Sequence, residues 1–359
     1  MSSSFGERIR YSIFGQSHGA AIGVVIDGLP AGEAIDMEAL GAFLRRRAPG
    51  GAPYATARRE ADEPEIVSGL VSNVTCGAPL CAIIKNTDAR SKDYAGTVNI
   101  PRPSHADYYA MLQTDGNADL RGGGHFSGRL TAPLCIAGGI ALQILARHGI
   151  SIGAHIQSIA GIEDAPFDPM CIDAKTLAAP AKAAFPVLDA QAGERMREMI
   201  AQAASEQDSV GGIVECCAIG LEAGKVGRGM FGGLESRLAQ AIFGIPAVKG
   251  VEFGAGFAAA AMRGSKHNDP FLLRAGKVET KTNCHGGSLG GISTGMPLIL
   301  RAAFKPTPSI SRPQNSVDIS TMQETELRIA GRHDPCVVPR AVPVVEAVVA
   351  AVLLDMLCQ

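Results

Sequence analysis

The chain has 359 residues, of which 46% are hydrophobic and 19% charged, and 33 Lys and Arg against 35 Asp and Glu give a net charge of −2. This composition excludes a disordered chain, and it excludes a global positive field that would hold nucleic acid or an anionic membrane. Nine cysteines without a CxxC pair indicate neither a disulfide framework nor a zinc site. From the cysteine spacing we expect no metal. The first residues lack the apolar run of a secretory signal, so we expect a cytoplasmic protein.

Apolar periodicity predicts strands and helices along the whole chain. Helix 37–47 has Met37, Leu40, Phe43 and Leu44 on one face. In chain order, the predicted elements are strand 22–26, helix 37–47, strands 66–71 and 80–85, helices 132–148 and 190–205, strand 213–219, helix 234–243, strands 247–253 and 298–304, and helix 341–354. The stretch 305–318, rich in Pro and Ser, is expected to be an ordered loop.

Helices 132–148 and 341–354 are apolar on almost every side, so each must be covered on more than one face. Thr131 is the expected N-cap of the first helix and Gly149 its C-terminal stop. Strands and helices do not alternate strictly, which favours an α+β fold over a doubly wound parallel sheet. No linker divides the chain, and we expect residues 1–359 to form a single domain.

Four segments combine glycine with histidine or charged residues: GQSHG at 15–19, RPSHADY at 102–108, RGGGHFSGR at 121–129 and GRHDPC at 331–336. Glycine lets backbone amides approach an anion, arginine binds phosphate with two hydrogen bonds, and histidine transfers protons near neutral pH. Any one of these histidines taken alone is more often structural. Together, the segments predict a site for a phosphorylated substrate.

Two other motifs point to different functions. Segment 254–259 reads G-x-G-x-x-A after a predicted strand, as in dinucleotide-binding turns, but no βαβ pattern surrounds it. Segment 286–290 reads G-x-S-x-G, and Asp318 and His333 follow in the order of a hydrolase triad. The polar residues before it make a poor buried strand. A serine hydrolase that uses Ser288 is nevertheless the main rival enzyme.

The glycine-rich segments also resemble the signatures of chorismate synthases, in the same order and at similar separations. FGQSHGAAIGVVIDGLPAG resembles the opening motif of that family, RGGGHFSGRLTA the middle motif and GRHDPCVVPRAVPVVEA the closing motif. NTDARSKDY, RPSHADY, AVKGVEFGAGF and KPTPSI match between them, so the resemblance spans essentially the whole chain. It implies a β-α-β sandwich with central apolar helices between antiparallel sheets, and a homotetramer.

The resemblance implies a carbon–oxygen lyase of the shikimate pathway, which leads to aromatic amino acids. The reaction is the anti 1,4-elimination of phosphate from 5-enolpyruvylshikimate 3-phosphate to give chorismate, with reduced FMN and no net redox change. His18 would give a proton to the departing phosphate, and His105 would lie beside the reduced flavin. Asp334 would face flavin N5 and assist removal of the C6 proton. Ser17 and Ser127 would hydrogen-bond around these groups.

The same resemblance implies a flavin site and a source of electrons. Arg46 matches an arginine that contacts a dinucleotide or the substrate phosphate. Reduced flavin would come from an external flavin reductase or from NADPH through the protein itself, and the loop after Arg47, with Pro53 where the family has a further arginine, favours external supply. The implied flavin contacts are His125, Phe126, Ser127, Pro246, Ala247, Gly290, Lys305, Pro306, Thr307, Pro308, Ser309 and Arg332.

Two motifs depart from the family pattern. Gln16 stands where the opening motif has Glu, and His125, Phe126, Gly128 and Leu130 replace four of the seven residues Arg-Ser-Ser-Ala-Arg-Glu-Thr in the middle motif. The sequence therefore leaves open which residues of the middle motif contact the flavin. These changes leave a second hypothesis, a flavin- or phosphoester-binding protein without turnover, against which the presence of His18, His105 and Asp334 argues.

Overall fold

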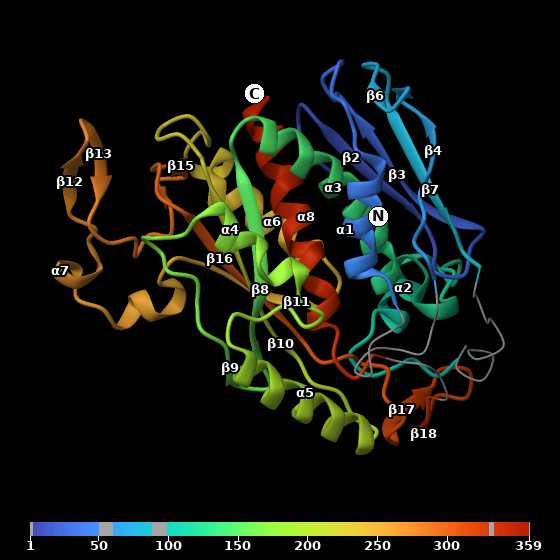
Figure 1. Cartoon of the computed structure of the whole chain (residues 1–359). Helices are drawn as coiled ribbons and strands as arrows, with labels where there is room; N and C mark the ends of the chain where they lie inside the picture. Colours follow the sequence, from blue (N-terminus) through green and yellow to red (C-terminus); the bar gives the residue numbers. More distant parts are fainter. Residues whose placement is uncertain (1–2, 50–59, 88–98, 330–333, 359) are drawn as a thin grey trace.

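The computed structural model describes residues 3–49, 60–87, 99–329 and 334–358, and in it two five-stranded antiparallel sheets enclose a layer of helices (Figure 1). The first sheet has the order β1 (Ser4–Phe5), β2 (Arg10–Gly15), β3 (Ala21–Asp27), β7 (Leu80–Lys85), β4 (Glu65–Ser68). The second has the order β11 (Val248–Phe253), β16 (Leu298–Phe304), β10 (Gly212–Ile219), β8 (Ser151–Ile159), β9 (Ile162–Glu163).

The middle layer is formed by α3 (Thr131–Arg147) and α8 (Val338–Leu357), which pack against each other. Helix α3 also packs on β3 and β7 of the first sheet, and α8 on β8 and β10 of the second. Both helices are buried along most of their length, as expected for helices that are apolar on almost every side. The predicted α+β sandwich with central apolar helices is therefore confirmed.

A glycine permits the close approach of the two central helices. A Cβ at Gly138 of α3 would lie 2.1 Å from Cα, 2.2 Å from Cβ and 2.4 Å from the carbonyl oxygen of Ala347 in α8. The window Gly128–Arg147 is long and apolar enough to cross a membrane, but 78% of it is buried inside the protein. Helix α3 is thus a core helix, and its contact with α8 is backbone to backbone.

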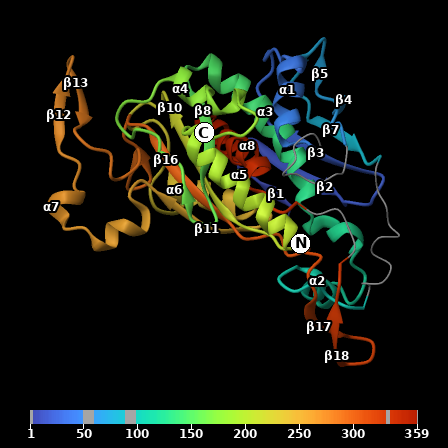
Figure 2. The same cartoon turned by 60° about the horizontal axis from the view of Figure 1, so that its bottom comes forward.

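Further helices and hairpins surround the sandwich. In both views the hairpin of β12 (Phe271–Arg274) and β13 (Lys277–Thr280) projects away from the two sheets, whereas β17 (Gln314–Asp318) and β18 (Gln323–Leu327) lie near α2 (Asp107–Gln113) (Figure 2). The helices are α1 (Met37–Arg47), α2 (Asp107–Gln113), α4 (Ala174–Ala178), α5 (Ala190–Ser205), α6 (Leu234–Phe243) and α7 (Gly264–His267). The hairpins are β5–β6 (Leu70–Val71, Val74–Thr75), β12–β13 (Phe271–Arg274, Lys277–Thr280), β14–β15 (Ser288–Leu289, Ile292–Ser293) and β17–β18 (Gln314–Asp318, Gln323–Leu327).

Most predicted elements are confirmed, and helices 37–47, 190–205 and 234–243 match to the residue. The prediction of a single strand at 66–71 is wrong, because Gly69 interrupts it and separates β4 from β5. The φ of Gly69 is +91°, and a Cβ there would lie 2.4 Å from Cα of Leu80. Thr131 is not an N-cap: it is the first residue of α3, and its hydroxyl donates to the carbonyl of Gly128 at 2.6 Å. The end of the predicted loop 305–318 forms β17.

A buried charged network crosses the second sheet. The His155 side chain is fully buried; its Nδ1 is 2.9 Å from Asp164 and its Nε2 is 3.1 Å from Glu215. Glu215 pairs in turn with Arg301 of β16 at 3.1 Å. Burial alone would lower the pKa of His155, but the hydrogen bonds to the two carboxylates outweigh it and raise that pKa. Both ring nitrogens therefore face carboxylates, one in β10 and one directly after β9, and the charged form of the imidazole is favoured.

Candidate active site

A cavity of about 1190 Å³ lies where the first turns of α3 and α8 meet the last turn of α1. Leu130, Thr131 and Leu134 line it from the start of α3, and Arg340 and Val344 from the start of α8. A helix N-terminus presents unpaired N–H groups and a partial positive charge. Since ligand pockets typically measure about 300–1,000 Å³, this cavity has room for more than one small molecule and favours anions at its inner end.

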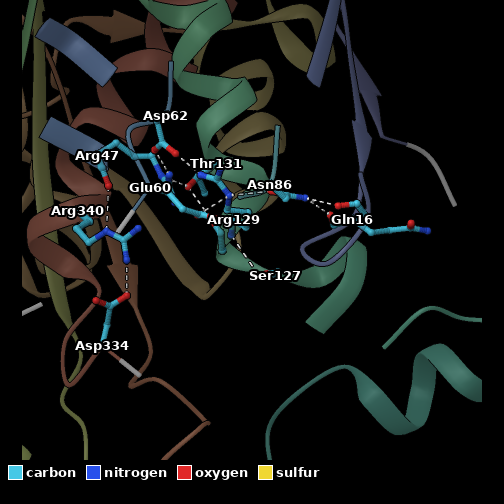
Figure 3. Close-up of polar contacts among 12 residues, drawn as sticks. Gln16, Arg47, Glu60, Asp62, Asn86, Ser127, Arg129, Thr131, Asp334 and Arg340 are labelled. Carbon is cyan, nitrogen blue, oxygen red and sulfur yellow. Dashed lines mark hydrogen bonds and ion pairs between the residues drawn. The ribbon is translucent and has the colours of Figure 1, made fainter. Parts of the chain in front are cut away.

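Two buried arginines, Arg47 and Arg129, lie in the cavity wall and are paired with two carboxylates (Figure 3). Arg47 and Arg129 both pair with the carboxylate of Asp62, and Nε of Arg129 lies 2.9 Å from Glu60. Burial would raise the pKa of Asp62, but the two guanidinium groups outweigh it and hold that pKa below its ordinary value. Nη2 of Arg129 is buried without a hydrogen-bond partner in the described ranges. It is a donor suited to an anionic ligand.

Asp334 reaches the cavity just before α8 and is held by an arginine of that helix. Nη1 of Arg340 donates to Oδ2 of Asp334 at 2.5 Å, and Nε of Arg340 donates to the carbonyl of Arg47 at 2.9 Å (Figure 3). Burial lowers the pKa of the Arg340 guanidinium, an effect that Asp334 opposes. Arg340 therefore links the carboxylate predicted from the closing motif to Arg47 in the cavity wall.

His105 lies two residues before the start of α2 and lines the cavity. Its Nδ1 is 2.7 Å from Oδ1 of Asp107. Nε of Arg102 lies 2.7 Å from Oδ2 of the same carboxylate, and Nη1 of Arg102 donates to the Ser309 hydroxyl at 3.1 Å. Burial would raise the pKa of Asp107, but the hydrogen bonds from Arg102 and His105 hold it well below its ordinary value.

Ser17 and His18 lie directly behind the glycine-rich loop, in the turn between β2 and β3. Both are buried, and Ser17 donates its backbone N–H to the Gly124 carbonyl at 3.0 Å. A Cβ at Gly122, whose φ is +60°, would lie 2.5 Å from Cε1 of His18. Gly122 lines the cavity, whereas neither Ser17 nor His18 does. Glycine is thus required for His18 to approach the cavity this closely.

His125 connects three segments of the cavity wall. Its Nδ1 lies 2.8 Å from the carbonyl of Gly15, so this nitrogen donates, and its Nε2 lies 2.6 Å from the hydroxyl of Ser3. Asn86 holds the same turn by donating to the carbonyls of Gln16 and Gly19, while the Gln16 side chain is exposed (Figure 3). The departure from Glu at this position therefore falls on a side chain outside the cavity.

The segment after β16 forms a further part of the cavity wall. Lys305 donates to the carbonyl of Ser104 at 2.9 Å, and burial, aided by the nearby Lys249, lowers the pKa of Lys305. The hydroxyl of Thr307 is buried without a partner in the part of the chain described. The predicted flavin contacts that line the cavity are His125, Phe126, Ser127, Pro246, Ala247, Lys305, Thr307, Pro308 and Ser309.

Besides Ser17 and His18, three predicted site residues of the described ranges are not in this lining: Arg46, Gly290 and Pro306. Arg46 places both terminal nitrogens on the buried carboxylate of Glu346, at 2.6 and 2.8 Å. Gly290 lies in the β14–β15 turn, and Pro306 is absent from the cavity wall although its neighbours line it. Arg332 lies outside the described residues, as does Pro53. At the end of α1 it is Arg47, rather than Arg46, that faces the cavity.

Known proteins resemble this chain over nearly its full length. The profile of the family described as chorismate synthase matches residues 9–358. This chain belongs to the chorismate synthase family. A chorismate synthase of Thermococcus gammatolerans is 50% identical, over 98% of this chain and 96% of the relative, and one of Lancefieldella parvula is 47% identical, over 99% and 96%. A solved structure titled as a chorismate synthase has a TM-score of 0.75 and 26% identity, over 98% of this chain and 92% of that chain.

Membership in the chorismate synthase family agrees with the surroundings of the rival motifs. The hydroxyl of Ser288 is buried without a hydrogen-bond partner in the described ranges, and Asp318 accepts from Ser320. His333 lies outside the described residues. Segment 254–259 leads into a six-residue 3₁₀ turn (Gly256–Ala261) after β11, which is an edge strand of an antiparallel sheet. Neither a nucleophile elbow nor a dinucleotide-binding βαβ unit is formed.

Several polar residues in or behind the cavity wall were given no role of their own from the sequence. Asp62 binds Arg47 and Arg129, Asp107 binds Arg102 and His105, and Arg340 holds Asp334. Arg102 and Asp107 flank His105 within the RPSHADY motif, so the motif itself carried that signal. Asp62 gave none, because an isolated carboxylate in a polar segment has no recognisable spacing to its partners.

Proposed function

We propose that this protein catalyses the elimination of phosphate from 5-enolpyruvylshikimate 3-phosphate to give chorismate. The observation that carries the proposal is the pair of buried arginines in the cavity wall. There Arg47 and Arg129 stand beside the starts of α3 and α8, and Nη2 of Arg129 is left to bind an anion. A phosphate and carboxylates are the groups that such a wall would bind.

The proposed cofactor is reduced FMN. A ligand with a ring system and a phosphate fits the donor set, because Lys305 and the unpartnered Thr307 hydroxyl offer polar contacts and Phe126, Pro246 and Ala247 offer apolar ones. When bound, reduced flavin supplies electron density that no side chain can supply. We assign its binding to the cavity-lining residues named above, together with Arg332.

We propose that three side chains handle protons in the reaction. His18 gives a proton to the departing phosphate, supported by its position directly behind Gly122. Asp334 assists removal of the C6 proton, with its charge held by Arg340. His105 lies beside the flavin at the α2 side of the cavity. Ser17 and Ser127 hydrogen-bond around these groups, and Ser127 is the one that lines the cavity.

An anaerobic assay tests this function. 5-enolpyruvylshikimate 3-phosphate is supplied with FMN alone, dithionite alone, or both, and phosphate and chorismate are measured. We expect both products, in equal amounts, only when FMN and reductant are present together. Binding of FMN without product under any condition would instead identify a binding protein without turnover. Ester hydrolysis that survives flavin removal and is lost in Ser288→Ala would identify a hydrolase.

We propose that electrons reach the flavin from an external reductase rather than from NADPH bound by this chain. The support is that Arg46, the position implied to contact a dinucleotide, has its guanidinium bound to Glu346. The measurement compares turnover with NADPH and with dithionite under anaerobic conditions. We expect turnover with dithionite and none with NADPH alone, whereas equal rates would show an intrinsic reductase.

We further propose one cytoplasmic domain that assembles as a homotetramer. The larger of two hydrophobic clusters in the described residues extends through both sheets and the helices between them, which supports one domain. Phe271 and Leu273 lie on one face of the β12–β13 hairpin and are 75% and 79% exposed, as a contact between copies requires. Leu273→Asp should lower the mass measured by light scattering, whereas Met322→Asp, an exposed control on the β17–β18 turn, should leave it unchanged.

A further inference from the structure

The bonding of His105 fixes which of its ring nitrogens carries a proton. Nδ1 lies 2.7 Å from Oδ1 of Asp107, and an ionised carboxylate only accepts hydrogen bonds. Nδ1 must therefore be the donor. In the neutral ring the lone pair then belongs to Nε2, the nitrogen beside Gly123, where a Cβ would lie only 3.1 Å away. The absence of a side chain at Gly123 leaves room for this nitrogen.

Asp107 is itself held in place on both oxygens. Oδ2 accepts from Nε of Arg102 at 2.7 Å and from its backbone N–H at 3.3 Å, while Oδ1 accepts from Nη2 at 2.8 Å. The remaining Nη1 is bound to Ser309. Because arginine stays protonated, none of its donors can become an acceptor. The Arg102 fork therefore fixes the plane of the carboxylate that orients His105.

The charged groups that surround His105 come from three segments. Asp107 and Arg102 face it from the start of α2 and the preceding turn, and Nη2 of Arg102 is 3.2 Å from Nδ1 and 3.4 Å from Nε2. Because a guanidinium group only donates, Nη2 can form a hydrogen bond only with Nε2 when Nδ1 carries the proton. Lys305 approaches from the segment after β16 and donates to the carbonyl of Ser104. The glycine-rich loop approaches the ring at Gly123. Among these groups Asp107 is the single acceptor for Nδ1–H.

We propose that Asp107 is a positioning residue that holds His105 in the Nδ1–H tautomer and leaves Nε2, the nitrogen beside Gly123, as the proton-accepting nitrogen. This inference rests on the proposed function, since it assigns a defined tautomer to the histidine, His105, that is proposed to lie beside the flavin. Asp107 touches Arg102 and His105 and does not line the cavity, so its effect on turnover would pass through the histidine.

The variant Asp107→Asn tests this because an amide must place its NH₂ group at one of two positions. At the Oδ2 position it would face two fixed donors of Arg102, Nε–H and the backbone N–H. At the Oδ1 position it would face one fixed donor, Nη2–H, together with His105, which can move its proton to Nε2 and accept. The second arrangement opposes fewer donors, so Asn should reverse the tautomer.

The experiment reads the tautomer directly in the protein without flavin or substrate. Protonated and unprotonated imidazole nitrogens have separate ¹⁵N resonances, and spectra at alkaline pH report the neutral ring. The His105 signals are identified by their loss in His105→Gln. We expect Nδ1–H in the wild type and in Asp107→Glu, which keeps an acceptor, and Nε2–H in Asp107→Asn. Asp115→Asn, the same change in the turn that ends α2, should leave the spectrum unchanged.

Kinetics with reduced FMN and substrate complete the test. Asp107→Asn should lower kcat by about 10²–10⁴-fold, the scale for a misplaced acid or base, with a much smaller change in KM, and Asp107→Glu should recover part of the rate. A wild-type ring protonated on Nε2 would overturn the proposal whether or not the variants fold, as would Asp107→Asn that retains Nδ1–H. Because the spectra need no turnover, a failure of the proposed function would leave the tautomer result intact.

Discussion

The contact between α3 and α8 makes Gly138→Ala a sharp test of the packing that builds the site. The new Cβ would lie 2.1 Å from Cα of Ala347, and ordinary contact begins at 3.4 Å, so the helices would have to move apart by 1.3 Å. Overpacking of this kind costs about 1–3 kcal/mol, and three contacts below 3.0 Å favour the upper end of that range. Alanine recovers about 1 kcal/mol of helix propensity. We therefore expect a net loss of about 2 kcal/mol in the free energy of unfolding.

The same shift should reach the cavity, because both helices begin there. A displacement of about 1 Å in a catalytic geometry can cost about 10²-fold in rate, so turnover per folded molecule should also fall. Unfolding in urea measures the stability, and anaerobic single-turnover kinetics the rate. Gly41→Ala in α1, where the new Cβ meets only the end of Arg45 at 3.4 Å, is the control and should gain about 0.5–1 kcal/mol. A Gly138→Ala protein as stable and active as the wild type would refute the proposed helix contact.

Three further predictions concern single side chains. His18→Ala should reduce anaerobic turnover by about 10²–10⁴-fold while FMN binding, measured by fluorescence, is retained; a normal rate would make His18 structural. Asp334→Asn should fold, bind FMN and lose about 10²-fold or more in single-turnover rate, and an unstable variant with a normal rate would assign Asp334 to the turn alone. Because the pKa of His155 is raised in the folded protein, the stability it contributes is complete below its unfolded pKa of about 6.5 and is lost as pH rises through the folded value. Urea unfolding of His155→Gln should lack this decline, and identical profiles for variant and wild type would contradict the buried ion pairs with Asp164 and Glu215.

Periodicity predicted the central layer of the fold but missed one of its most buried strands. Helices apolar on all sides can only lie between two covering layers, so the two stretches that became α3 and α8 determined the sandwich. Strand β8 was not predicted, because Gly153, His155 and Ser158 interrupt its apolar pattern. The imidazole of His155 is tolerated there only through carboxylates from other parts of the chain. A long-range ion pair of this kind leaves no periodic signal.

The candidate site, too, was predicted from the sequence only in part. Motifs predicted His105, Ser127 and Asp334, which the fold brings to one cavity from three distant segments. The choice between neighbouring arginines could not be made from spacing, because successive helical residues point about 100° apart and either face was open. The fold directs Arg46 to Glu346 and Arg47 to the cavity.

The central claim is an elimination that needs reduced flavin but does not consume it. The most direct measurement supplies a limiting, known amount of photoreduced FMN under strict anaerobiosis, with 5-enolpyruvylshikimate 3-phosphate in large excess. Phosphate, chorismate and the reduced-flavin absorbance are then followed together. We predict many molecules of each product per flavin, in a one-to-one ratio, with the flavin still reduced at the end. Product that stops at one equivalent per flavin, or flavin oxidised in step with turnover, would contradict the account.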